Sequence, residues 1–321
     1  MTRLGRTGVE VSALCAGTMN MGSDADEAES GRLYRAYRDG GVTFFDCANI
    51  YAGGLTEEIF GRLIAGHRDE LVITTKFGHI ASPGGNGRGA SRRHQVAEID
   101  KSLKRLGTDR VDVLFVHRWD PYTPLEEQLR ALEDILRAGK ALYLGASNWA
   151  AWQYMKALGI AAREGWQPLQ VIQPMYSLVK RQAEVELLPL AVAEGLAVTS
   201  YSPIGAGVLS GKYAPGKRPT SGRVVDRADY AKRYAPDWMV ETAERFTLLA
   251  DELGHHPVSL AIAWAGAHPG ITCPIIGARS TEQLAPALKS VEIEMTPELY
   301  ARIAALSPTP PPATDRLEEQ G

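Results

Sequence analysis

The feature that most constrains the fold is a regular alternation of short apolar runs with segments of helical spacing. Continuously apolar runs of this length are typical of buried parallel strands that are covered by helices on their outer side. The predicted strands cover residues 13–17, 42–45, 71–76, 111–116, 141–145, 169–173, 196–200 and 273–276. Eight such units in a chain of 321 residues fit a closed (β/α)8 TIM barrel of the α/β class better than an open sheet.

The domain organisation follows from the same pattern. An alternating stretch around Gly8 predicts a short N-terminal hairpin over residues 3–12, before the first barrel strand. Extra C-terminal helices are predicted at 239–253, 257–267 and 297–306, after a long loop over 203–237. We therefore expect a single barrel domain over residues 1–306 and a flexible, Pro-rich tail over 307–321.

A doubly wound nucleotide-binding sheet is the main alternative fold. It requires a Gly-x-Gly-x-x-Gly turn directly after an early strand. The nearest matches are Gly205-x-Gly207, which follows the seventh strand and has Ser210 at the third position, and a glycine-rich stretch over 85–89 that lies well past its strand. Neither position suits that fold, which favours the barrel.

Composition excludes several classes of partner. A net charge of −3 and a pI near 6.2 argue against nucleic acid or an anionic membrane surface. No apolar run approaches the roughly 20 residues of a membrane span, and the first residues lack the apolar core of a signal peptide. The three cysteines are scattered, which argues against a disulfide framework. A cytoplasmic protein is expected.

Helix boundaries are signalled at two places. Ser91 begins a predicted helix that runs to Leu106. The stretch Thr123-Pro124-Leu125-Glu126 reads as a capping box with proline at the first helical position, opening a helix to Arg137.

Polar residues gather at the ends of the predicted strands, which is where barrel enzymes carry their chemistry. The second strand ends in Asp46 with Tyr51 close behind, the third ends in Lys76, and the fourth is followed by His117. Each alone has an ordinary structural explanation, such as a capping aspartate or a satisfied core histidine. Four ionisable residues of four types on three successive strand ends are harder to explain by packing.

These four side chains suit proton transfer. A free tyrosine has a pKa of about 10, and a neighbouring ammonium such as Lys76 is expected to lower that pKa toward the operating pH. Asp46 would keep Lys76 charged, and His117 would donate a hydrogen bond to a substrate oxygen or relay a proton to Tyr51. General acid catalysis contributes roughly 10²–10⁴-fold, so positioning and a reactive partner would have to supply the rest.

Later strand ends indicate what that partner is. The amide and hydroxyl groups of Ser147, Asn148 and Gln173 are suited to bind a carboxamide. Tyr201 offers a flat face on which an aromatic ring could stack, and the glycines near Gly207 allow the backbone to approach a pyrophosphate closely. Lys212 and Arg279 add positive charge. A nicotinamide dinucleotide over the barrel mouth fits these candidate residues: Ser147, Asn148, Gln173, Tyr201, Ser202, Gly207, Lys212 and Arg279.

Taken together, several motifs resemble the aldo-keto reductase superfamily over about residues 1–306. The matching stretches are Gly17-Thr18-Met19, Asp46-Cys-Ala-Asn-Ile-Tyr51, Thr75-Lys76-Phe77-Gly78, His117-Arg118-Trp119-Asp120, Gly145-Ala146-Ser147-Asn148, Gln173-Pro174-Met175-Tyr176 and Tyr201-Ser202-Pro203. The resemblance implies NADPH-dependent reduction of aldehydes or ketones, with Tyr51 as general acid and the other three residues as its supporting tetrad. It also implies a barrel that binds the cofactor extended, without a Rossmann domain.

The resemblance extends to the adenosine end of the cofactor. By analogy with the branch of the family that has a Gly-Ala-Arg pattern, Arg279 and Gln283 are expected partners of a 2′-phosphate, and Gly277 is a further expected cofactor-binding residue. Ala287 stands where many relatives have an Asn, so NADH remains the alternative cofactor.

The expected substrate is a small carbonyl compound. Met19, Trp119 and Trp149 are predicted to line the substrate mouth, which favours apolar or aromatic carbonyls. The main alternative function is a nicotinamide-binding regulatory subunit of the channel-associated type, with little turnover. A metal-dependent hydrolase needs clustered His and carboxylate ligands, and His117 is the one histidine at a predicted strand end, so no metal site is expected.

Overall fold

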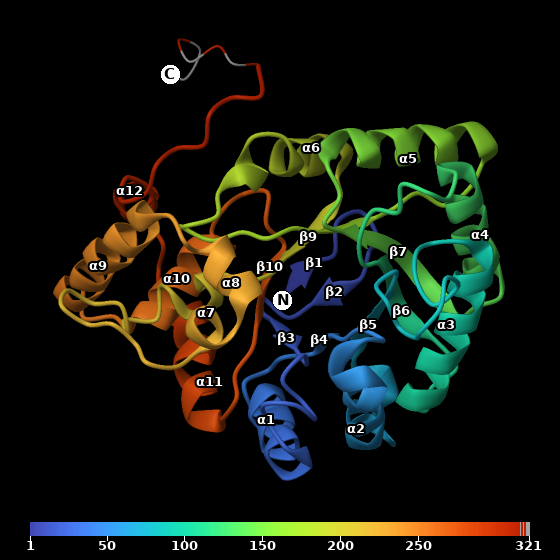
Figure 1. Cartoon of the computed structure of the whole chain (residues 1–321), viewed down its shortest axis with the longest axis horizontal. Helices are drawn as coiled ribbons and strands as arrows, with labels where there is room; N and C mark the ends of the chain where they lie inside the picture. Colours follow the sequence, from blue (N-terminus) through green and yellow to red (C-terminus); the bar gives the residue numbers. More distant parts are fainter. Residues whose placement is uncertain (315, 317, 319–321) are drawn as a thin grey trace.

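The computed structural model describes residues 1–314, 316 and 318, and within them the chain forms a closed parallel barrel (Figure 1). Its strands are β3 (Cys15–Gly17), β4 (Phe44–Asp46), β5 (Val72–Phe77), β6 (Val111–Val116), β7 (Ala141–Ser147), β8 (Val171–Gln173), β9 (Ala197–Ser200) and β10 (Cys273–Ile276). They pair in chain order, and β10 closes the ring against β3. The predicted (β/α)8 barrel is confirmed.

Alternate residues of each strand fill two separate parts of the core. Val113 and Phe115 of β6 point into the barrel, whereas Leu114 and Val116 pack outward beneath the helices. All four are essentially inaccessible to solvent. A strand buried on both faces has no polar side, which is why the sequence shows continuous apolar runs.

The N-terminal hairpin is also confirmed and adds to the barrel interior. Its strands β1 (Thr2–Arg3) and β2 (Glu10–Val11) are antiparallel, and Figure 1 shows them at the centre of the ring. Leu4 and Val11 are completely buried in the same cluster as the inward-facing strand residues. The hairpin therefore belongs to the interior core of the barrel.

Helices surround the strands (Figure 1). Those that follow strands along the ring are α1 (Glu27–Asp39), α2 (Leu55–Ile64), α3 (Arg92–Leu106), α4 (Leu125–Arg137), α5 (Ala151–Glu164), α6 (Leu187–Glu194) and α11 (Thr281–Leu288). Three further helices, α9 (Asp237–Glu252), α10 (Pro257–Gly266) and α12 (Pro297–Ala304), form a group at one side of the barrel. The predicted extra C-terminal helices are thus present.

Two local predictions need correction. The expected capping box at Thr123 is wrong, because Pro124 is the N-cap of α4 and the Thr123 hydroxyl donates to Asp120 Oδ2 at 2.7 Å. The segment over 203–237 is not a plain loop, since it contains a 3-10 turn at Gly205–Gly207 and the short helices α7 (Arg223–Asp226) and α8 (Ala228–Arg233). Short helices of this kind carry too few residues for a period to show in sequence.

The C-terminal segment is anchored at Leu306, two residues past the end of α12. The Leu306 carbonyl accepts hydrogen bonds from Thr242 Oγ1 at 3.1 Å and Arg245 Nη2 at 2.6 Å, after which the chain leaves the body of the barrel (Figure 1). Part of the tail that was predicted to be flexible, residues 315, 317 and 319–321, lies outside the described residues. No helix among the described residues is long and apolar enough to cross a membrane.

The packing of α2 on α3 yields a testable prediction. A Cβ on Gly61 would lie 2.6 Å from the Arg105 carbonyl oxygen and 2.7 Å from that of Leu106, which are backbone atoms that cannot move aside easily. Gly61→Ala is therefore expected to lower the free energy of unfolding by roughly 1–3 kcal/mol. Gly159→Ala in the exposed middle of α5, where no atom lies within 4 Å, should instead stabilise by about 0.5–1 kcal/mol. Urea denaturation of both variants checks the contrast, and equal effects would contradict it.

Candidate active site

A buried ion pair lies at the mouth end of the barrel. Lys76, at the end of β5, places Nζ 2.6 Å from Asp46 Oδ2 at the end of β4 and 2.7 Å from the Cys47 carbonyl oxygen. Both side chains are almost completely excluded from water. Burial alone would lower the pKa of Lys76, but the Asp46 carboxylate raises it above its usual value, so the ammonium stays charged.

The Asp46 carboxylate is held by neutral donors as well. Oδ1 accepts from Thr74 Oγ1 at 2.9 Å and from Gln173 Nε2 at 2.8 Å. A buried carboxylate with several hydrogen bonds and one ammonium partner is fixed in direction. Asp46 therefore orients Lys76 toward the third member of the site.

That third member is Tyr51. Its hydroxyl lies 3.4 Å from Lys76 Nζ, at the start of a tight turn in which Ala52 and Gly53 both have positive φ. Burial raises the pKa of Tyr51 to about 12, and the positive charge of Lys76 offsets only part of that rise. The expected lowering of the pKa of Tyr51 is therefore wrong in the isolated protein, and the phenol is protonated at neutral pH.

His117 stands beside this phenol. The two rings meet edge to face, with centroids 6.2 Å apart. Burial, followed by the positive charge of Lys76, lowers the pKa of His117 well below its usual value, so the imidazole is neutral and holds one N–H. A protonated phenol next to a neutral imidazole provides two hydrogen-bond donors to one small volume.

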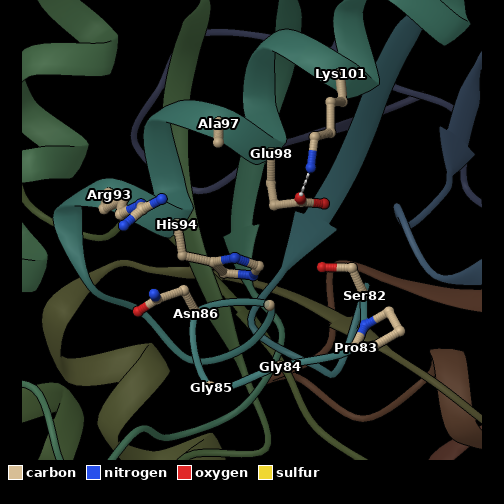
Figure 2. A pocket seen from close by; sticks show the side chains of 11 residues that line it. Ser82, Pro83, Gly84, Gly85, Asn86, Arg93, His94, Ala97, Glu98 and Lys101 are labelled. Atoms are coloured by element: carbon tan, nitrogen blue, oxygen red, sulfur yellow. Dashed lines mark hydrogen bonds and ion pairs between the residues drawn. The ribbon is translucent and has the colours of Figure 1, made fainter.

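The loop that carries Tyr51 is hydrogen-bonded to α3 through Asn49 and Glu98. Asn49 donates from its backbone N–H to the Lys76 carbonyl at 3.1 Å and from its side chain to Glu98 Oε2 at 2.6 Å. Figure 2 shows Glu98 paired with Lys101 on α3, above His94 and the 82–87 loop, where a cavity of about 310 Å³ lies. Asn49 and Glu98 were not predicted, because only the tertiary structure brings α3 to this loop.

Residues predicted to hold a carboxamide lie together at the ends of β7, β8 and β9. Asn148, in a left-handed conformation with φ of 59°, donates to the His117 carbonyl at 3.0 Å and accepts from Tyr201 Oη at 2.7 Å. Ser147 donates to the Gln173 carbonyl at 2.8 Å. A cavity of about 200 Å³ is bordered by Asn148, Trp149 and Tyr201. The Gln173 side chain, however, already uses its NH₂ group at Asp46.

Positively charged residues gather farther along the same face. Burial, followed by the charge of Arg279, lowers the pKa of Lys212, whereas the Asp226 carboxylate opposes this change and Arg223 adds to it. Lys212 forms no ion pair within the described part of the chain. Its Nζ approaches Gly207, where a Cβ would lie 3.2 Å from it. This arrangement places a positive charge over a glycine turn, with no carboxylate in direct contact.

Arg279 and Gln283 adjoin this cluster at the start of α11. Arg279 Nε lies 3.1 Å from Asp24, and its backbone N–H donates to Gln283 Oε1 at 3.2 Å. Gly277, two residues earlier, lies close to Gly17, since a Cβ added at Gly277 would be 3.6 Å from the Gly17 carbonyl oxygen. Ser202, two residues past the end of β9, has a positive φ of 60° and is half-buried.

Asn20 forms hydrogen bonds to two other loops of this face, and sequence reasoning did not predict them. Arg223 in α7 donates to Asn20 Oδ1 at 2.7 Å, and Asn20 Nδ2 donates to the Ala278 carbonyl at 2.8 Å. The segment after β9 is thereby fastened to the loops that follow β3 and β10. Neither residue carries a sequence signal of this role, since their partners are more than two hundred positions away.

The residues predicted to line the substrate mouth differ in their exposure to solvent. Met19 and Trp119 are partly exposed, whereas Trp149 is only 3% exposed and lies behind Trp119, with ring centroids 4.9 Å apart. Trp152 also meets Trp119, with ring centroids 5.6 Å apart. The accessible aromatic surface is therefore supplied by Trp119 and Trp152, and Trp149 supports it.

The fold and this arrangement define a (β/α)8-barrel protein with a polar site at the mouth of the barrel. The family model for the aldo/keto reductase family matches residues 13–308, and the chain belongs to that family. Across residues 1–314, 316 and 318, no group of three or more His, Cys, Asp or Glu side chains is placed to hold a metal ion.

Relatives with assigned names cover nearly the whole chain. The uncharacterized oxidoreductase YrpG of Bacillus subtilis (strain 168) is 39% identical, covering 96% of both chains. A probable voltage-gated potassium channel subunit beta of Oryza sativa subsp. japonica is 37% identical, covering 97% of this chain and 98% of the relative. L-glyceraldehyde 3-phosphate reductase of Escherichia coli (strain K12) is 34% identical, covering 87% of this chain and 84% of the relative.

Proposed function

We propose that the protein is an NADPH-dependent oxidoreductase that reduces aldehydes or ketones to alcohols, with Tyr51 as the general acid. The observation that carries this proposal is the chain of contacts from Asp46 through buried Lys76 to the Tyr51 hydroxyl, beside neutral His117. Such a set stabilises an oxygen that gains negative charge as a hydride adds to its carbon.

The proton steps follow from the geometry. The carbonyl oxygen would accept hydrogen bonds from the Tyr51 hydroxyl and the His117 N–H, which polarises the carbonyl carbon. Bound NADPH would supply the hydride that adds to that carbon. Tyr51 would then donate its proton to the oxygen, giving the alcohol and a phenolate. The adjacent Lys76 ammonium, held charged by Asp46, stabilises that phenolate until a proton returns from solvent.

The residues present fit a dinucleotide phosphate. The positive charge of Lys212, the neighbouring Arg223 and Arg279, and the glycine turn at Gly207 supply cations and accessible backbone where phosphates would lie. Asn148 and Tyr201, which border the 200 Å³ cavity, are suited to hold the nicotinamide. NADH remains the alternative cofactor.

Turnover is the direct test. The purified protein with NADPH should oxidise the cofactor in the presence of a small aldehyde or α-dicarbonyl compound, measured by the loss of absorbance of the reduced nicotinamide. Failure to reduce any member of a broad carbonyl panel would contradict the enzymatic proposal.

Cofactor choice is expected to depend on Arg279. We expect Arg279→Ala to weaken NADPH binding by roughly 10–100-fold, because a charge-assisted contact to the 2′-phosphate is lost, and to change NADH binding little. Arg302→Ala, which removes an exposed arginine of α12 from its ion pair with Glu252 of α9, is the control and should change neither. Fluorescence titration of both cofactors measures the difference, and equal weakening of both would contradict the assignment.

A second candidate function rests on the rice relative. The name of that relative, a probable voltage-gated potassium channel subunit beta, makes a nicotinamide-binding regulatory subunit with little turnover the alternative for this chain. The carbonyl panel separates the two functions. Tight NADPH binding without carbonyl-dependent oxidation would favour the regulatory subunit.

A further inference from the structure

Arg118 and His79 lie next to each other at the mouth, beside the proposed catalytic residues. The parallel register of β5 and β6 pairs Phe77 with Val116, so the residues two positions on, His79 and Arg118, leave the barrel at matching levels. The two segments stay close past the strand ends, since a Cβ on Gly78 would lie 3.9 Å from the Arg118 backbone. His79 meets His117 edge to face, with ring centroids 4.6 Å apart.

The positive charge of Arg118 is uncompensated. Its side chain is exposed and forms no ion pair or hydrogen bond within residues 1–314, 316 and 318. Asp120, the carboxylate two residues on, is already satisfied, because Oδ2 accepts from Ala90 N at 2.8 Å and Thr123 Oγ1 at 2.7 Å, and Oδ1 accepts from Tyr122 N at 3.0 Å. The guanidinium is therefore free to bind an external anion.

The neighbouring imidazoles are neutral donors rather than competing cations. Burial and then the charge of Arg118 lower the pKa of His79, and Arg118 also contributes to the low pKa of His117. Lys76, the other cation nearby, is neutralised by Asp46. Arg118 therefore supplies the net positive charge on this side of Tyr51.

We propose that Arg118, assisted by His79, is an anion-recognition site beside the catalytic tyrosine, and that the preferred carbonyl substrates carry a carboxylate or phosphate group. This inference rests on the proposed carbonyl reduction. Trp119, the next residue, supplies an apolar wall, so an aromatic or short-chain aldehyde with an anionic end matches the site. A guanidinium can bind either group through two parallel N–H donors, which positions the substrate as well as attracting it.

Matched substrate pairs provide the test. Benzaldehyde and 4-carboxybenzaldehyde form the carboxylate arm, and glyceraldehyde and glyceraldehyde 3-phosphate form the phosphate arm. Each is measured with NADPH and the wild-type protein, Arg118→Gln, Arg118→Lys and His79→Gln. Arg93→Gln is the matched control, because Arg93 is also an exposed arginine with no ion pair in the described chain but lies on α3, away from Tyr51.

We expect Arg118→Gln to lower kcat/KM for an anionic substrate by roughly 10–100-fold, mainly through KM, and to leave the neutral partner within about threefold. Arg118→Lys should recover part of the loss, since it keeps the charge but loses the paired donors. His79→Gln should give a smaller loss, and Arg93→Gln none. Added salt should raise KM for the anionic substrates alone. The arm that responds identifies the anion.

Two results would overturn the inference alone: reduction of neutral substrates with no preference for the anionic partners, or an equal loss on both members of a pair in Arg118→Gln. If the wild-type protein reduces neither member of either pair nor any other carbonyl, the proposed function fails together with the inference.

Discussion

Tyr51→Phe is expected to lower kcat for carbonyl reduction by roughly 10²–10⁴-fold while NADPH binding is retained. The substitution removes one oxygen atom, which is the proton source 3.4 Å from Lys76, and leaves the ring that packs against His117. The assay is single-turnover oxidation of bound NADPH by an aldehyde, with cofactor affinity measured separately by fluorescence.

The matched control is Tyr122→Phe. Tyr122 is 93% exposed in the loop between β6 and α4, so losing its hydroxyl should not change the rate. Equal rates for the wild type and Tyr51→Phe would show that Tyr51 is not the acid. A loss of NADPH binding in step with the rate would mean that the substitution disturbs the cofactor site instead.

The pH dependence gives an independent check on the same group. Because burial raises the pKa of Tyr51 to about 12, the phenol keeps its proton across the usual assay range. Reduction, which needs the protonated form, should therefore be flat between about pH 6 and 9 and fall only as the pH approaches that pKa. Alcohol oxidation needs the phenolate and should speed up as the pH rises. A fall in the reduction rate centred near pH 7 would contradict this assignment.

The second large effect concerns the buried pair of Asp46 and Lys76. Asp46→Ala removes the carboxylate and leaves an ammonium enclosed without its counter-ion, so the free energy of unfolding should fall by roughly 3–5 kcal/mol. Lys76→Met leaves the carboxylate with its bonds from Thr74 and Gln173, so we expect a smaller loss. Urea denaturation at neutral pH measures both.

The double variant Asp46→Ala/Lys76→Met separates stability from catalysis. Neither member of the buried ion pair remains in this variant. Its loss in free energy of unfolding should therefore be smaller than the sum of the losses of the two single variants. Its catalytic rate should stay low, because the phenolate formed at Tyr51 has no ammonium beside it. Recovery of the rate together with stability would show that the pair serves the fold alone.

Features set by neighbouring residues in the sequence were predicted better than features set by contacts between distant residues. The strand over residues 111–116 was predicted with its observed bounds, because both of its faces are buried and its apolar run is continuous. Ser91 was correctly placed at the start of α3, where its hydroxyl accepts from His94 N. At Thr123 an equally good local pattern was wrong, since Asp120 competes for the hydroxyl.

The candidate site shows the same division. Barrel geometry places the carboxyl ends of the strands at one face, so the sequence is enough to group Asp46, Lys76 and His117. The direction in which the pKa of Tyr51 shifts could not be predicted from sequence. It depends on whether burial, which raises the pKa, outweighs the charge of Lys76 3.4 Å away, which lowers it. The engagement of the Gln173 amide with Asp46 likewise depends on side-chain distances across the barrel.

Closure of the barrel by its last strand determines when, during synthesis, the site can form. The strand β3 pairs on one side with β4 and on the other with β10, where Cys15 lies opposite Ile275. The loop bearing Tyr51 leaves the ribosome early, yet the barrel beneath it has an open edge until β10 emerges. A nascent chain that stalls before β10 would expose unpaired strand edges beside the site and would depend on chaperones.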